Sequence, residues 1–265
     1  MDLAGSRALI TGATGGIGAA IARALHARGA VVLLSGRQAD VLERLGAELG
    51  ERAEVLVADL CDREQVSELP GRAGQVDLLV ANAALPASGH LLGFEPAHID
   101  RALDVNLRAP IQLARALAPG MSDRGFGHLV FISSISGKVA APGSSLYSAT
   151  KFGLRGFALG LREDLHGSGV GVSTVFPGFI RDAGMFHESG AKLPAYVRTR
   201  TPEQVARAVV RGVERDKPEL DVAPLGLRAG AAAAGIAPGV IAAVQRRFGA
   251  REMSDAIARG QAAKR

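Results

Sequence analysis

The sequence predicts an α/β fold, a doubly wound parallel sheet of about seven strands with helices on both faces. Short apolar runs typical of buried parallel strands alternate with stretches of helical periodicity along nearly the whole chain. Such alternation produces a parallel sheet with right-handed crossovers and helices on both faces. The 265 residues suffice for one large core, and no linker, repeat or low-complexity tract divides them. We therefore expect a single domain.

The individual elements are predicted from where these patterns begin and end. Strands are expected at residues 8–10, 30–34, 55–58, 76–80, 128–132, 170–176 and 220–222. Helices are expected at residues 19–28, 41–49, 99–117, 145–165 and 202–215, the last with Thr201 as its N-cap. Residues 1–223 would hold the whole sheet, and residues 224–265 would be a helical C-terminal extension of the same domain.

The composition argues against several classes of protein. Although 31 basic and 26 acidic residues give a net charge of +5, the basic residues are scattered and only 4% of the chain is aromatic. A nucleic-acid platform would combine a basic stripe with aromatic side chains, so we expect no nucleic acid as a partner. The six histidines show no metal-ligand spacing. A lone Cys61 and the lack of a signal-peptide pattern predict a reducing, cytoplasmic location.

A glycine-rich stretch lies between the first expected strand and the first expected helix. It reads Thr11-Gly12-Ala13-Thr14-Gly15-Gly16-Ile17-Gly18. In a dinucleotide site, Gly12 would allow the tight turn, Gly16 the approach of a pyrophosphate, and Gly18 close packing of helix and strand. The phosphates would lie at the helix N-terminus, beside Thr14, Gly15 and Ile17. A simple turn is the alternative interpretation.

The ends of the second and third expected strands bear on the choice of cofactor. The second strand is followed by Arg37, where an acidic residue would grip the ribose hydroxyls of NAD. Because a guanidinium suits a 2′-phosphate, NADP(H) is favoured, with NAD as the alternative. Arg37 could also be an ordinary solvated arginine. Asp59 and Leu60 follow the third strand and are expected beside the adenine, unless Asp59 caps the next helix.

Tyr147 and Lys151 are the strongest candidates for catalysis. Four residues apart on a helix, they lie on one face about one turn apart. A nearby ammonium favours the phenolate, so we expect Lys151 to lower the pKa of Tyr147 and make it an acid/base near neutral pH. Ser134 follows the fifth expected strand and could donate a hydrogen bond to a reacting oxygen. A pair at this spacing is weak evidence alone, and a serine after a strand is usually a turn former.

The motifs together resemble the short-chain dehydrogenase/reductase family in order and spacing over about residues 5–223. The resemblance implies a Rossmann-type fold that binds NAD(P) and carries its own catalytic site. The family's active-site tetrad maps onto Asn106, Ser134, Tyr147 and Lys151. It implies that Tyr147 is the general acid or base, that Lys151 binds the nicotinamide ribose, that Ser134 orients the substrate oxygen, and that Asn106 holds a water in the proton relay. Asparagine is also an unfavourable residue in mid-helix, which independently suggests a role for Asn106.

The resemblance also places cofactor contacts after the fourth and sixth strands. They are Asn82, Ala83, Pro177, Gly178 and Ile180, in addition to Tyr147 and Lys151. Two departures stand out. The family often has glycine where this chain has Ala84, which would crowd the backbone if a positive φ were needed. It often has threonine where this chain has Asp182, so the backbone of Ile180 would have to hold the carboxamide.

The substrate pocket is expected to be apolar, with ordinary packing as the alternative. Candidate wall residues are Leu85, Leu91, Leu92, Val139, Ala141, Phe179, Met185, Phe186, Leu193 and Tyr196, the last four in a covering segment at 184–200. The uncharged stretch 229–244 is interrupted by glycine and proline and is too short to cross a bilayer. Residues 224–251 are expected to pack on the core or on another subunit, or to contact a membrane surface peripherally. The family resemblance implies a homo-oligomer, a dimer or a tetramer.

These observations predict an oxidoreductase that transfers a hydride between NADP(H) and a carbonyl or alcohol group. The substrate would be a largely apolar small molecule, such as a ketone, an aldehyde, or an acyl or steroid-like compound. The alternative is a nucleotide-binding scaffold or sensor on the same fold, without turnover. Because both Tyr147 and Lys151 are present, the sequence favours the enzyme.

Overall fold

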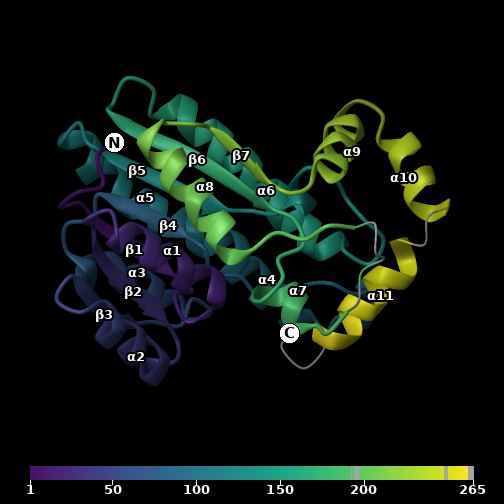
Figure 1. The fold of residues 1–265 in the computed structure, drawn as a ribbon, viewed down its shortest axis with the longest axis horizontal. Coiled ribbons are helices and arrows are strands. Elements are labelled where there is room, and N and C mark those ends of the chain that lie inside the picture. Colours follow the sequence, from purple (N-terminus) through teal and green to yellow (C-terminus); the bar gives the residue numbers. More distant parts are fainter. Residues whose placement is uncertain (192, 194–196, 248–249, 262–265) are drawn as a thin grey trace.

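Seven apolar runs pair side by side into one parallel sheet in a computed structural model that describes residues 1–191, 193, 197–247 and 250–261. The strand order is β3-β2-β1-β4-β5-β6-β7 (Figure 1). The strands are β1 (Arg7–Thr11), β2 (Val31–Gly36), β3 (Ala53–Val57), β4 (Leu78–Ala81), β5 (Gly127–Ile132), β6 (Val170–Pro177) and β7 (Glu219–Val222). Every residue of β4 and β5 is buried, because helices cover both faces of the central sheet. The predicted doubly wound fold is confirmed.

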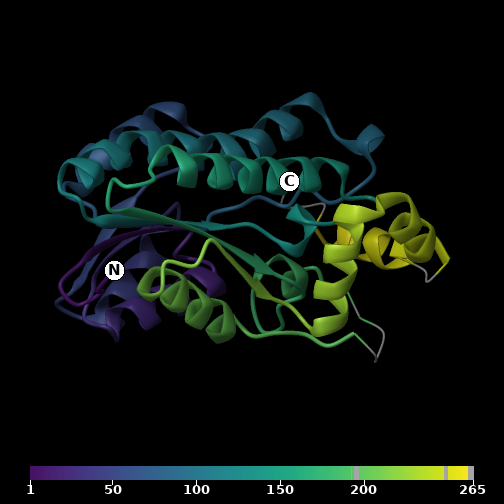
Figure 2. The ribbon, with the colours of Figure 1, turned by 90° about the horizontal axis from the view of Figure 1, so that it is seen from above.

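The helices form a layer on each face of the sheet (Figure 2). One face is covered by α1 (Gly16–His26), α2 (Ala39–Leu49) and α8 (Pro202–Glu214), whose apolar residues share a core cluster with β1 and β2. The other face is covered by α3 (Arg63–Ala73), α5 (Ala109–Asp123) and α6 (Ser145–Asp164). Thr201 caps α8 as predicted, in a capping box with Gln204.

The helix expected at residues 99–117 is divided in the structure. It consists of α4 (Pro96–Leu103), a π-helical turn at Asp104–Arg108, and α5. Asn106 lies in the π turn and is fully buried. A π turn inside a helix is often found at functional sites. The prediction of one continuous helix was therefore wrong in detail, at the residue that had suggested a role.

The strand order places a ligand crevice at the carboxyl ends of the central strands. The chain runs outward from β1 through β2 to β3, and then returns to add β4 on the other side of β1. In an open α/β sheet, ligands bind beyond the carboxyl ends of the strands where the order reverses. The loops after β1, β2 and β4 meet at this position. The sequence motifs are expected to converge at these carboxyl ends.

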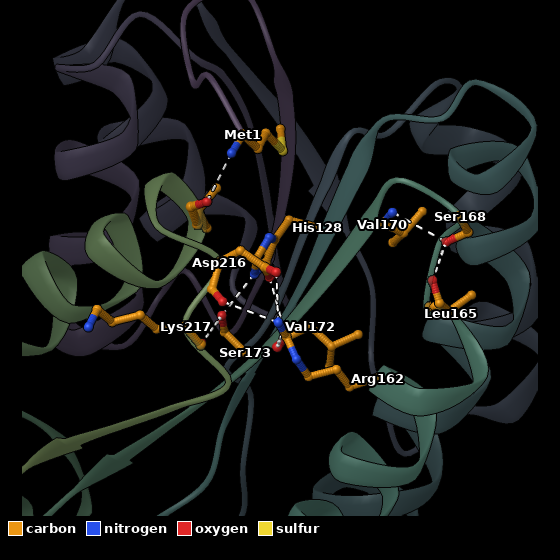
Figure 3. A network of polar contacts seen from close by, with 11 residues as sticks. Met1, His128, Arg162, Leu165, Ser168, Val170, Val172, Ser173, Asp216 and Lys217 are labelled. Carbon is orange, nitrogen blue, oxygen red and sulfur yellow. Dashed lines mark hydrogen bonds and ion pairs between the residues drawn. The ribbon is translucent and has the colours of Figure 1, made fainter.

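The amino ends of the strands carry a network of buried polar contacts (Figure 3). The Oγ of Ser173 donates to the carbonyl of Lys217 at 2.6 Å, so the Nε2 of His128 must donate to Ser173 at 2.8 Å. Arg162 donates to the carbonyl of Val172 and forms an ion pair with Asp216 at 2.7 Å. The network joins β5, β6 and α6 to the loop between α8 and β7. Burial lowers the pKa of His128 to about 4, so the imidazole is neutral.

The C-terminal region adds three helices that the sequence patterns had not resolved. They are α9 (Leu225–Ile236), α10 (Pro238–Arg247) and α11 (Ala250–Gln261). Figure 1 shows α9 and α10 projecting from the body, whereas α11 returns to lie beside the short helix α7 (Gly184–Glu188). Short 3₁₀ turns lie at Leu91–Gly93 and Ile135–Gly137. Within the described ranges, no helix combines the length and apolar character needed to cross a membrane.

Candidate active site

The glycine-rich loop joins β1 to α1, and its shape depends on the absence of side chains. Gly12 has a φ of +67°, and a Cβ there would lie 2.8 Å from the Cα of Ala83. A Cβ at Gly18 would overlap the carbonyl oxygen of Gly12. Protein interiors do not absorb such overlaps without backbone movement. The turn predicted at Gly12 and the close packing predicted at Gly18 both correspond to observed contacts of the loop.

The N-terminus of α1 suits an anion. Its N-cap, Gly15, makes no side-chain capping bond, and the first turn has no acidic residue. The first N–H groups of a helix lack intrahelical partners and lie at the positive end of its dipole. Beside them, a Cβ at Gly16 would overlap the side chain of Ala183 from the segment after β6. Gly16 was expected only to admit a pyrophosphate, and the structure gives it this second packing role.

The end of β2 presents polar groups without partners. The side chain of Ser35 is 1% exposed, and its Oγ has no hydrogen-bond partner in the described parts of the chain. Arg37 is exposed and lines the same cavity as Ser35. No ion pair joins its guanidinium to another described residue. A buried hydroxyl and a free guanidinium at a strand end fit the ribose and 2′-phosphate region of a dinucleotide.

A cavity of about 840 Å³ connects the glycine-rich loop with the ends of β2, β3 and β4. The predicted cofactor residues that line it are Gly12, Thr14, Gly15, Gly16, Ile17, Gly18, Arg37, Asp59, Leu60, Asn82 and Ala83. These residues come from four separate loops, and the topology brings them to one place. The cavity wall therefore fits the phosphate-rich, elongated cofactor that the sequence predicts.

The side chains of Asn82 and Asp59 form hydrogen bonds with the backbone of the loops in the wall of the cofactor cavity. The Nδ2 of Asn82 donates to the carbonyls of Thr11 at 3.0 Å and Gly12 at 3.1 Å, which braces the glycine-rich loop. The carboxylate of Asp59 accepts the N–H of Cys61 at 2.9 Å. Asp62 is the residue that caps α3, so the alternative that Asp59 is a helix cap is wrong.

Tyr147 and Lys151 lie one turn apart near the N-terminus of α6, as the spacing predicted. The Nζ of Lys151 is 5.7 Å from the centre of the Tyr147 ring and donates to the carbonyl of Ile132 at 3.0 Å. Burial lowers the pKa of Lys151 to about 8 and raises the pKa of Tyr147 to about 12. A hydrogen bond with Ser134 acts in the opposite direction on Tyr147 and is the smaller effect.

The expectation that Lys151 lowers the pKa of Tyr147 is therefore wrong. The ammonium is directed to Ile132 rather than to the phenol oxygen, and desolvation outweighs its attraction for a phenolate. Tyr147 is held as a neutral phenol. In this state its O–H is a proton donor.

Ser134 stands beside Tyr147 at the end of β5. Its extended backbone caps the 3₁₀ turn Ile135–Gly137, and its Oγ accepts the N–H of Ser136 at 3.1 Å. That bond uses a lone pair and leaves the hydroxyl proton for another acceptor. The hydrogen bond between Ser134 and Tyr147 places two hydroxyl groups together at the cavity wall. The two hydroxyl groups can both form hydrogen bonds with one substrate oxygen.

Asn106 is held beneath the site rather than in the cavity wall. Its Oδ1 accepts the N–H of Leu85 at 2.6 Å, and its Nδ2 donates to the carbonyl of Leu85 at 3.0 Å. The oxygen and the nitrogen of the amide thus both bind Leu85 and connect the π turn to the loop after β4. The side chain has a positioning contact here, and the water-holding role implied by the family resemblance stays a prediction.

A second cavity, of about 210 Å³, adjoins the first and contains Ser134, Tyr147 and Lys151. The predicted cofactor residues Pro177, Gly178 and Ile180 also line it. The two cavities adjoin, because both are lined by Ile17, Asn82, Ala84, Gly184 and Met185. Of the predicted apolar wall, Ala141, Phe179, Met185 and Phe186 lie in this cavity. The rings of Phe179 and Phe186 pack edge to face, 5.0 Å between centres.

Several expected wall residues lie elsewhere. Leu85 lines the cofactor cavity, and Leu92 is fully exposed on the 3₁₀ turn Leu91–Gly93. Leu91, Val139 and Leu193 do not line the substrate cavity, and Tyr196 lies outside the described residues. Hydrophobic character identified candidates but could not decide which loop turns inward.

The two departures from the family pattern have different outcomes. Ala84 does not adopt a positive φ, so alanine causes no strain there. Asp182 does have a positive φ, of 68°, and its carboxylate pairs with Arg181 at 3.3 Å on the surface. Aspartate tolerates this conformation better than most residues. Ile180 is buried and lines the same cavity as Pro177 and Gly178, and the contact of its backbone with the carboxamide stays a prediction.

Sequence reasoning missed part of the site entirely. The substrate cavity is also lined by Met253, Ser254, Ile257 and Gln261, all from α11. Their helical spacing on one face was a detectable signal for a helix. Nothing in that spacing indicated that α11 packs against α7, more than sixty residues earlier in the chain.

Known proteins agree with this geometry. Residues 6–194 match the family model for short chain dehydrogenases. The chain belongs to the short-chain dehydrogenase/reductase family. It is thus an NAD(P)-dependent oxidoreductase, as the sequence had predicted. Nodulation protein G of Rhizobium sp. (strain N33) is 41% identical over 69% of this chain and 76% of its own length.

Further relatives within the short-chain dehydrogenase/reductase family are similar over comparable lengths. The 3-oxoacyl-acyl-carrier-protein reductase FabG of Rickettsia conorii is 37% identical over 68% of this chain and 75% of its own length. Ketoacyl reductase HetN of a Nostoc species is 34% identical over 83% and 79%. A solved short-chain dehydrogenase of Sphingobium yanoikuyae in complex with NADPH has a TM-score of 0.77 and 30% identity, covering 89% of this chain and 95% of that one.

Proposed function

We propose that the protein catalyses the NADPH-dependent reduction of a carbonyl group in a largely apolar small molecule. The observation that carries the proposal is that Ser134, Tyr147 and Lys151 line a cavity that shares wall residues, among them Asn82 and Met185, with the cofactor cavity. One cavity has the loops and charge for a dinucleotide, and the other has apolar walls. Relatives named as ketoacyl reductases support a 3-oxoacyl thioester as a substrate class to test first.

The chain's own residues have distinct parts in this reaction. NADPH, when bound, supplies the hydride. Ser134 donates a hydrogen bond to the carbonyl oxygen, and Tyr147 gives that oxygen its proton. Because burial keeps the pKa of Tyr147 far above neutral pH, the phenol is protonated and can act as the proton donor. Lys151 binds the nicotinamide ribose, and Asn106 keeps the loop after β4 in place through Leu85.

The preference for NADPH rests on Arg37. Its guanidinium lines the cofactor cavity, where it can form charge-assisted bonds with a 2′-phosphate. Solved relatives in complex with NADPH or NADP support the same preference. NAD remains the alternative cofactor, because Arg37 is exposed and can move aside.

The competing function is a nucleotide-binding scaffold or sensor without turnover. The decisive experiment is a spectrophotometric screen of NADPH oxidation over ketones, aldehydes and 3-oxoacyl thioesters of N-acetylcysteamine. The enzyme should oxidise NADPH with at least one carbonyl class. NADPH binding without oxidation by any member of the panel would favour the scaffold.

We also propose the assembly, the domain limits and the location of the protein. Residues 1–223 would bind cofactor and carry out catalysis, and residues 224–265 would be an extension of the same domain in a cytoplasmic homo-oligomer, a dimer or tetramer. Exposed Phe152 and Leu159 on α6 suit a subunit interface. A second exposed apolar set lies on α9 and α10, namely Leu225, Ile236, Val240 and Val244. Light scattering measures the assembly, and liposome sedimentation measures peripheral membrane contact.

A further inference from the structure

Gln261, the last described residue of α11, is a buried polar residue in an otherwise largely apolar wall. Its side chain lines the substrate cavity with Met253 and Ile257, and it is 4% exposed. The catalytic groups Ser134 and Tyr147 line the same cavity from β5 and α6. Gln261 is therefore part of the wall of the substrate cavity without belonging to the catalytic group.

The orientation of the Gln261 amide is fixed by one hydrogen bond. Its Nε2 donates to the carbonyl of Met185 in α7 at 3.1 Å. Because a carbonyl can only accept, the NH₂ group must face Met185 and the Oε1 must lie on the other side. The approach of the two segments is close, since a Cβ at Gly260 would overlap the carbonyl of Ser189. The amide is therefore held in place rather than free to turn.

The Oε1 of Gln261 has no donor. It is buried, and no described residue gives it a hydrogen bond. Buried acceptors in folded proteins nearly always have a partner, because leaving one unpaired is unfavourable. An oriented, unpaired acceptor carried by a residue that lines a ligand cavity is the kind of group that fixes ligand specificity.

We propose that Gln261 is a specificity-determining residue, whose Oε1 accepts a hydrogen bond from an amide N–H or hydroxyl of the substrate. The inference rests on the proposed carbonyl reduction. The substrate would then be apolar over most of its surface, with one hydrogen-bond donor away from the carbonyl. A site that pairs with a substrate donor discriminates strongly against an analogue that lacks it, because its own acceptor is then left unpaired.

The test compares matched 3-oxoacyl thioesters that differ only in the donor. The first probe is the N-acetylcysteamine thioester, which has one amide N–H. The second carries an N-methyl group on that amide, and the third is an S-alkyl thioester with a terminal hydroxyl on its acyl chain. The S-alkyl thioester without the hydroxyl is the reference. The first and third probes distinguish a donor on the thiol side from a donor on the acyl side.

The wild type should show a kcat/KM about 10- to 100-fold higher for one donor-bearing probe than for its matched analogue. In Gln261→Met, which has similar length but no acceptor, the two values should agree within about threefold. Gln261→Glu keeps an acceptor and should keep the preference, although it loses the bond to Met185. Met253→Leu changes the same wall without removing a polar group and should also keep the preference.

The outcomes separate the two proposals. Turnover of the probes with no preference for either donor, or a preference that survives in Gln261→Met, would overturn the role of Gln261 and leave carbonyl reduction intact. Absence of NADPH oxidation with every probe would overturn both for this substrate class. Circular dichroism of Gln261→Met and Gln261→Glu verifies that each variant is folded.

Discussion

The two ends of the sheet differ in whether they carry polar groups that lack a partner within the chain. At the amino ends, His128, Ser173, Arg162 and Asp216 bond to one another or to backbone carbonyls. At the carboxyl ends, the Oγ of Ser35 lacks a partner, and Arg37 faces open space. The paired groups lie on β5, β6 and α6 and in the loop before β7, and the unpaired groups lie at the end of β2. Polar groups satisfied within the chain hold the fold together, whereas unpaired groups are available to ligands.

Two basic residues of α6 allow the two ends of the sheet to be compared directly. Of the predictions in this comparison, substitution of one of them has the largest expected effect on catalysis. Lys151 lies at the carboxyl ends of the strands and Arg162 at the amino ends. Lys151→Met removes the cation that is proposed to bind the nicotinamide ribose, and it should lower kcat by about 10²-fold, the effect of misplacing a reacting group. Arg162→Met should leave kcat within twofold and instead lower the free energy of unfolding by about 1 to 2 kcal/mol. Steady-state rates and urea unfolding of both variants measure this, and similar kinetic losses would break the comparison.

The amino-end network should make stability depend on pH. Because the pKa of His128 is about 4 when folded and near 6.5 when unfolded, the unfolded state binds more protons between these values. Stability should therefore fall as the pH drops from 6.5 to 4, by about 3 kcal/mol at most from this group. Urea unfolding at several pH values measures the effect. His128→Asn does not titrate and should flatten this part of the curve, and an unchanged slope would contradict the assignment.

At the carboxyl ends, Arg37→Asp should shift cofactor preference. Loss of a charge-assisted bond to the 2′-phosphate should lower the affinity for NADPH relative to NADH by about ten- to hundredfold. Arg72→Asp, on the exposed surface of α3, makes the same change in net charge away from the cavity. Fluorescence titration with both cofactors measures the ratio. A wild type that binds NADH and NADPH with equal affinity would show that Arg37 does not bind the 2′-phosphate.

The smallest expected effect concerns the glycine-rich loop. Gly18→Ala should lower the free energy of unfolding by about 1 to 2 kcal/mol, because overlap with Gly12 outweighs the helix-forming advantage of alanine. Gly15→Ala is the matched control, since a Cβ there would lie 3.5 Å from the carbonyl of Gly12, an ordinary contact. It should change stability by less than about 0.5 kcal/mol. Equal effects would mean that the loop relaxes freely.

The sequence predicted those parts of the molecule that depend on local patterns. Buried strands appear as apolar runs, and the turn at Gly12 and the pair of Tyr147 and Lys151 are set by short spacings. Two properties that depend on distant contacts could not be predicted. The pKa of Tyr147 is governed by burial, and the wall from α11 by docking against α7. Spacing along the chain does not encode either.

The polar network at the amino ends of the strands also depends on contacts between residues that are far apart in the sequence, so the sequence patterns did not predict it. His128 and Ser173 are forty-five residues apart, and only strand pairing brings them together. Neither residue stood out in the sequence, because a lone histidine has no distinguishing neighbours. Asn106 was singled out as unfavourable in mid-helix, yet its bonds to Leu85 and the π turn around it appear only in the structure.

The central claim is that the carboxyl ends form one catalytic centre in which Tyr147 is the proton donor. The most direct test measures NADPH affinity and NADPH oxidation for wild type and Tyr147→Phe, on a carbonyl substrate found in the screen. The variant keeps the packing of the ring and removes only the hydroxyl. We predict an unchanged affinity for NADPH and a turnover at least about 10²-fold lower. Equal turnover by the two proteins would show that Tyr147 is structural and would contradict the account.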